Sequence, residues 1–139
     1  MREAIRSALA LRAGGASSAS DVAEATRGTW GDMSVRLASL IGVRGVDVLF
    51  GRALHLTGAD FPWLGISAER GDSAAALAGF SARIETCEPA LALEASSALL
   101  GKFTDLLATL IGESLTERVL APVIASAPTP PTPQRESAP

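Results

Sequence analysis

The stretch that decides the fold runs from Pro89 to Leu120 and reads PALALEASSALLGKFTDLLATLIGESLTERVL. It is the densest apolar run of the chain, and Pro89 stands where a proline suits the first turn of a helix. At about 100° per residue, its leucines and Phe103 gather on one broad side, while Lys102 and Asp105 fall on the other. The stretch therefore predicts a long amphipathic helix that needs partners along a wide face.

Three further helical patterns precede this helix. Apolar residues recur at helical spacing over residues 20–41, 45–57 and 72–87, Gly42 ends the first of these helices, and Cys87 falls on the core-facing stripe of the third. Aromatic residues make up only 4% of the chain, and a core of Leu, Ala, Val and Ile favours helices over β-sandwiches. The short connection between the helices over residues 20–41 and 45–57 predicts that these two helices are antiparallel neighbours. We therefore predict an all-α protein, an antiparallel four-helix bundle in up-down-up-down order.

The sequence divides into one domain and two flanking segments. Residues 1–17 are expected to form a short, loosely attached helical arm and a flexible Gly/Ser linker. Residues 18–123 are the predicted helical domain. In it the apolar stripe changes phase at Gly112, so the long helix either bends there or turns its last part to a different partner. Pro122 is expected to end this helix, and residues 124–139 are predicted to be a disordered, proline-rich tail.

Composition argues against several classes of protein. A net charge of −3 gives no basic face for nucleic acid, and a single cysteine and a single histidine cannot build the usual zinc or di-iron sites. The apolar run near the N-terminus is too short for a signal peptide, and charged residues interrupt the long helix before it could span a bilayer. We expect a cytoplasmic protein without metal, cofactor or membrane contact.

His55, the only histidine, lies on the polar side of the helix over residues 45–57. A histidine exposed on a helical bundle resembles the phosphoacceptor of histidine phosphotransfer domains. The resemblance implies that His55 accepts a phosphoryl group. Those domains usually place a lysine three residues and a glycine four residues after the histidine, whereas here Gly58 and Ala59 hold these positions. An ordinary surface histidine is the simpler interpretation.

The bulky aromatic residues offer a different hypothesis. Trp30, Phe61 and Trp63 could line a small-molecule pocket between helices, which would make the protein a ligand-binding sensor. Large aromatic side chains also bury readily. On that simpler interpretation Trp30 belongs to the core, and the segment from Phe61 to Leu64 covers an open end of the bundle.

The preferred hypothesis is protein–protein interaction. The long helix is apolar over more than the width of about 100° that a bundle helix needs. The apolar side chains spread around it from Leu106 through Leu99, Phe103, Leu107, Leu100 and Ile111 to Leu115. A two-fold homodimer would bury the excess, although a monomer with this helix at its centre accounts for it equally well. We predict a non-enzymatic, homodimeric regulatory or signalling module. Eleven arginines against one lysine suggest a GC-rich genome. The assignment to bacterial regulation rests on analogy with what small helical modules commonly do.

Overall fold

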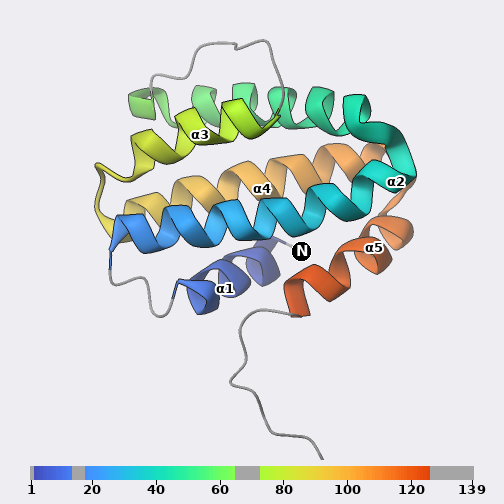
Figure 1. The fold of residues 1–139 in the computed structure, drawn as a ribbon, viewed down its shortest axis with the longest axis horizontal. Helices are drawn as coiled ribbons and strands as arrows, with labels where there is room; N and C mark the ends of the chain where they lie inside the picture. Colours follow the sequence, from blue (N-terminus) through green and yellow to red (C-terminus); the bar gives the residue numbers. More distant parts are fainter. Residues whose placement is uncertain (1, 14–17, 65–72, 126–139) are drawn as a thin grey trace, which may run out of the picture.

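The computed structural model describes residues 2–13, 18–64 and 73–125, and over these ranges the chain is helical without strands. The elements are α1 (Arg2–Arg12), α2 (Ala19–Asp60), the short 3-10 helix η1 (Pro62–Leu64), α3 (Ser73–Ile84), α4 (Pro89–Ile111) and α5 (Glu113–Ala125), shown in Figure 1. The all-α class predicted from the sequence is confirmed.

Helix α2 consists of two segments joined by a bend at Gly42. This residue has φ 86° and ψ 154°, a conformation that is essentially reserved for glycine. The hydroxyl of Ser18 caps the first segment by accepting a hydrogen bond from the backbone N–H of Asp21 at 3.1 Å. The predicted break at Gly42 is therefore confirmed, and the second segment continues to Asp60, beyond the expected end at Thr57.

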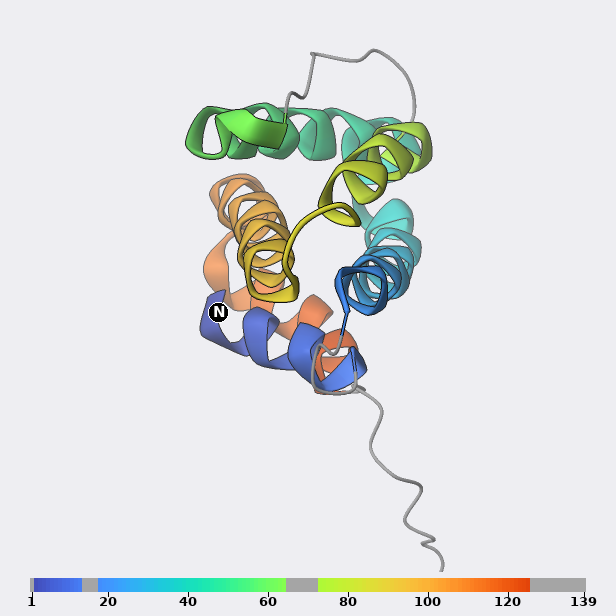
Figure 2. The ribbon, with the colours of Figure 1, turned by 90° about the vertical axis from the view of Figure 1, so that its left-hand side faces the viewer.

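The helices do not alternate in direction along the chain. The first segment of α2 and α4 run the same way and pack together, as Figure 1 shows. The second segment of α2 crosses above them and α3 returns in the same direction as that segment, so the predicted up-down-up-down order does not describe these helices. Figure 2 shows α1 and α5 below the core, opposite the second segment of α2.

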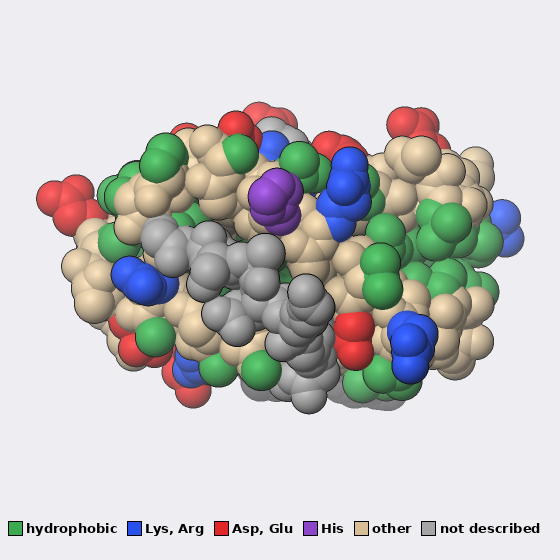
Figure 3. Space-filling view, turned by 90° about the horizontal axis from the view of Figure 1, so that it is seen from above, with side chains coloured by type: hydrophobic (Ala, Val, Ile, Leu, Met, Phe, Trp, Pro, Cys, Tyr) green, Lys and Arg blue, Asp and Glu red, His purple; other side chains and the backbone are tan. Residues whose placement is uncertain are grey.

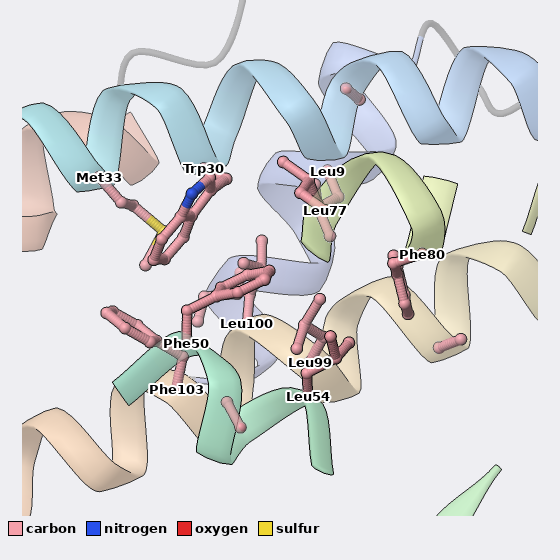
Figure 4. Close-up of a cluster of buried hydrophobic side chains, with 14 of the residues drawn as sticks. Leu9, Trp30, Met33, Phe50, Leu54, Leu77, Phe80, Leu99, Leu100 and Phe103 are labelled. Carbon is pink, nitrogen blue, oxygen red and sulfur yellow. The ribbon is translucent and has the colours of Figure 1, made fainter. Parts of the chain in front are cut away.

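Helix α4 is the central element and contacts all four other α-helices. Its fully buried side chains meet an aromatic cluster that joins both segments of α2 to α4 (Figure 4). In this cluster the Trp30 ring centroid lies 4.4 Å from that of Phe50 and 4.7 Å from that of Phe103. The most deeply buried large side chains of the core are Leu9, Leu37, Phe50, Leu64, Phe80, Ile84, Leu99, Leu100, Phe103, Leu107 and Leu120.

Helix α1 is part of the core, which corrects the prediction of a loosely attached arm. Ile5 and Leu9 are buried in the same hydrophobic cluster as the leucines of α4. The guanidinium of Arg12 also forms an ion pair with Asp32 of α2, with 2.7 Å between nitrogen and oxygen. Gly28 gives this guanidinium room, since a Cβ there would lie 3.0 Å from it. Residues 14–17 of the predicted linker lie outside the described residues.

The long helix predicted over residues 89–120 is two helices. Gly112 separates them with φ 94° and ψ 153°, and its backbone N–H still donates to the carbonyl of Ala108 at 2.8 Å. The phase change seen in the sequence therefore marks a chain reversal, because α5 folds back beneath the core (Figure 1). Pro122 does not end α5, which continues to Ala125. The predicted tail thus starts too early at residue 124, and its residues 126–139 lie outside the described residues.

The third helix agrees with its predicted stripe except at its end. Leu77, Phe80 and Ile84 are buried as expected. Helix α3 ends at Ile84, so Cys87 lies beyond it, is partly exposed, and donates its S–H to the Arg83 carbonyl at 3.6 Å. The prediction that Cys87 faces the core is wrong, because the helical spacing does not extend that far.

Candidate functional site

A cleft of about 290 Å³ lies between α1, the end of α2 and α4. Figure 2 shows the start of α1 and the second segment of α2 on either side of α4. The cleft is lined by side chains at helical spacing, namely Glu3 and Arg6 from α1, Glu94, Ser97, Ala98 and Lys102 from α4, and Asp60 and Phe61 from the end of α2. It is therefore a charged cleft with one aromatic wall.

One of the charged pairs in the cleft is already formed. The ammonium of Lys102 lies 2.7 Å from a carboxylate oxygen of Asp60, and the Lys102 side chain is only 20% exposed. Asp60 is the last residue of α2, where the helix dipole disfavours a negative charge, so the lysine offsets both the carboxylate and the helix end. The Ser97 hydroxyl donates to the Leu93 carbonyl at 2.7 Å and keeps its acceptor lone pairs.

A second feature is an apolar surface at the end of the molecule where α2 bends. Leu40 and Val43 flank Gly42 and are 45% and 66% exposed, and Leu110, just before Gly112, is 60% exposed. Both turns lie at the same end of the molecule in Figure 1, and Figure 3 shows hydrophobic side chains gathered there. We call Leu40, Val43 and Leu110 the bend-end surface.

The three aromatic residues predicted to line a pocket do not come together. Trp30 is buried against Phe50 and Phe103, so it fills the core and leaves no pocket wall. Trp63 is 41% exposed and stands edge-on to Phe61, with ring centroids 6.0 Å apart. Of the three, only Phe61 lines the cleft. Leu64, at the end of this segment, is fully buried, as the covering role predicts.

The residues predicted to contact a partner through the long helix are largely covered by their own chain. Leu100 is fully buried, and Ile111 and Leu115 are partly buried. The reason is that α1, α5 and both segments of α2 surround α4, so its wide apolar face is used within one chain. The apolar area of Leu100, Ile111 and Leu115 that favoured a dimer is therefore largely used within the chain, whereas Leu110 of α4 stays 60% exposed.

His55 is exposed on the second segment of α2, and Figure 3 shows it on the upper face of the molecule. It does not line the cleft or the bend-end surface. Within residues 2–13, 18–64 and 73–125, no group of three or more His, Cys, Asp or Glu side chains is placed to hold a metal ion. None of the helices in these ranges has the length and apolar character that crossing a membrane requires.

Sequence reasoning did not find the cleft. The two charged residues of α4 that line the cleft, Glu94 and Lys102, are about two turns apart, and Glu3 and Arg6 are about one turn apart on α1. Such spacing indicates a polar helix face, but only the packing of three distant segments makes it a cleft. Comparison of the chain with protein-family models, with curated proteins and with solved structures found no match.

Proposed function

We propose that the protein is a non-enzymatic interaction module that forms a homodimer and serves bacterial regulation or signalling in the cytoplasm. The bend-end surface carries this proposal. Leu40, Val43 and Leu110 expose large apolar side chains at one end of a domain whose remaining leucines are mostly buried. Exposed apolar residues that gather in one place are typical of interaction surfaces, whereas singly scattered ones are not informative.

A second copy of the chain is the occupant that the flanking charges favour. Arg44 follows Val43 and Glu113 follows Gly112, so a cation and an anion border the two turns. Both side chains are exposed, and neither forms an ion pair within the described residues. A two-fold contact presents the same patch on both subunits, so Arg44 of one copy would face Glu113 of the other. A surface with this charge pattern is complementary to itself.

The test is the mass of the protein in solution, measured by light scattering coupled to size-exclusion chromatography over a range of micromolar concentrations. We expect a dimer for the wild-type chain. Leu110→Glu should give a monomer, because it would bury two unpaired carboxylates in the contact. Leu11→Glu is the matched control, since Leu11 is 62% exposed on α1 and does not belong to the bend-end surface, and it should leave the dimer intact.

A charge exchange tests the pairing of Arg44 with Glu113. Arg44→Glu places two acidic residues against each other and should weaken the dimer by about tenfold or less, since rim charges contribute modestly. The double variant Arg44→Glu, Glu113→Arg should restore it. A wild-type mass equal to that of one chain at all concentrations would overturn the homodimer proposal, and so would a dimer that Leu110→Glu leaves unchanged.

A further inference from the structure

The charges that line the cleft between α1, α4 and the end of α2 are only partly neutralised by the protein. Asp60 and Lys102 pair with each other at 2.7 Å. The other three charged side chains, Glu3, Arg6 and Glu94, make no ion pair within the described part of the chain. The cleft therefore presents one guanidinium and two carboxylates to whatever enters it.

This set of charges is complementary to a small molecule with one carboxylate and two cationic groups. We propose that the cleft binds a free basic amino acid, such as arginine or ornithine. The α-carboxylate of the ligand pairs with Arg6, since a guanidinium binds a carboxylate through two parallel hydrogen bonds. The α-ammonium and the side-chain cation pair with the carboxylates of Glu3 and Glu94. A cation without a carboxylate would leave Arg6 unpaired and repelled.

Size and shape support a ligand of this kind. Ligand pockets commonly have volumes of about 300 to 1,000 Å³, so a cleft of about 290 Å³ suits a molecule smaller than a typical drug. Phe61 and Ala98 supply an apolar wall for the methylene chain, and an aromatic ring also attracts a guanidinium or ammonium group placed over its face. Trp63 holds the Phe61 ring edge-on at 6.0 Å between centroids.

Calorimetric titration with three ligands of nearly equal size tests the assignment of charges. L-arginine carries all three charged groups, agmatine lacks the carboxylate, and L-citrulline lacks the cationic side chain. We expect saturable binding of arginine, and binding weaker by about tenfold for each of the other two, which corresponds to one lost charged pair. Amide shifts of Phe61 and Ser97 in NMR spectra should follow arginine binding.

Two variants identify the partners of these groups. Arg6→Gln should weaken arginine binding by about tenfold and strengthen agmatine binding, because it removes a cation that repels agmatine, while Glu94→Gln should weaken the binding of both. The matched controls are Arg36→Gln and Glu117→Gln, which change the net charge equally at exposed positions outside the cleft. Because all these side chains are exposed, none of the changes should prevent folding.

The absence of saturable arginine binding at millimolar concentration would overturn the proposal. Equal binding of arginine and agmatine would overturn it as well, because Arg6 would then have no carboxylate to recognise. Equal losses for Glu94→Gln and Glu117→Gln would reduce the effect to attraction by the net negative charge and also reject the site. None of these measurements depends on the oligomeric state. The binding-site proposal and the homodimer proposal can therefore be rejected independently of each other.

Discussion

The indole of Trp30 packs against the edge of the Phe103 ring, with centroids 4.7 Å apart and ring planes at 89°. This T-shaped contact joins the first segment of α2 to α4, and Phe50 adds the second segment of α2 at 4.4 Å from the same indole. Aromatic pairs in this geometry contribute about 0.5–1.5 kcal/mol beyond the area they bury. Trp30 thus connects the three helical segments that enclose the core.

Replacement of Trp30 should strongly destabilise the domain. Trp30→Ala is expected to lower the free energy of unfolding by about 3–5 kcal/mol, because it leaves a cavity between three helices. The matched control is Trp63→Ala, which removes the only other tryptophan from a 41% exposed position and should cost less than about 1 kcal/mol. Urea unfolding followed by circular dichroism measures both. Equal losses would show that Trp30 does not organise the core.

Helix α1 offers a matched pair of leucines that tests its attachment. Leu9 is fully buried, whereas Leu11 is 62% exposed on the same helix. We expect Leu9→Ala to lower the free energy of unfolding by about 2–5 kcal/mol and Leu11→Ala to change it by less than about 0.5 kcal/mol. Chemical denaturation gives both values. A Leu9→Ala variant as stable as the wild type would mean that α1 is the loose arm the sequence suggested.

The two positive-φ glycines should respond to alanine in the opposite sense from a glycine inside a helix. Gly42→Ala and Gly112→Ala place a side chain in a backbone conformation that costs of order 1–3 kcal/mol, so each should lower the melting temperature. Gly51→Ala introduces a better helix former where a Cβ would meet nothing within 4 Å, and it should stabilise the protein by up to about 1 kcal/mol. The melting temperatures of the three variants, measured by thermal unfolding, test these expectations. A higher melting temperature for Gly42→Ala would contradict the positive φ at Gly42.

Pro122 is expected to weaken α5 even though the helix passes through it. A proline inside a helix removes one backbone hydrogen bond and crowds the carbonyl one turn earlier, at a typical cost of about 3 kcal/mol. Pro122→Ala should therefore raise the melting temperature. Pro89→Ala is the control, because Pro89 occupies the first turn of α4, where proline is well tolerated, and no comparable gain is expected. A fall in stability for Pro122→Ala would show that α5 needs the proline.

The sequence predicted local structure well where spacing and glycine carried the signal. Helical periodicity identified the buried faces of Leu77, Phe80 and Ile84, and Gly42 marked the first break. The change of phase at Gly112 left open whether the helix bends there or meets a different partner. These features depend on residues a few positions apart, which is the range over which periodicity is informative. The boundary at Pro122 was wrong because packing of α5 against the core outweighs the preference of one residue.

The arrangement of the helices could not be predicted in the same way. An apolar stripe says that a face is buried but not by which helix, so the wide face of α4 was compatible with a second subunit or with one chain. The structure buries Leu100 completely, and its helix α4 contacts elements from both ends of the sequence, α1 and α5. The cleft could not be predicted for the same reason, since it is formed by Arg6, Asp60 and Glu94, which lie far apart in the sequence.

The parallel packing of the first segment of α2 against α4 has a consequence for how the domain folds. Neighbours that run the same way cannot be joined by a tight turn, so the chain between them, which includes the second segment of α2 and α3, has to span the length of the pair. Contacts between residues so distant along the chain slow folding, because the entropy of closing a large loop is lost before the contacts form. A nascent chain can bring Phe50 to Trp30 early but completes the contacts of this indole only after Phe103 has been synthesised. Folding should therefore be slower than that of a simple helical hairpin.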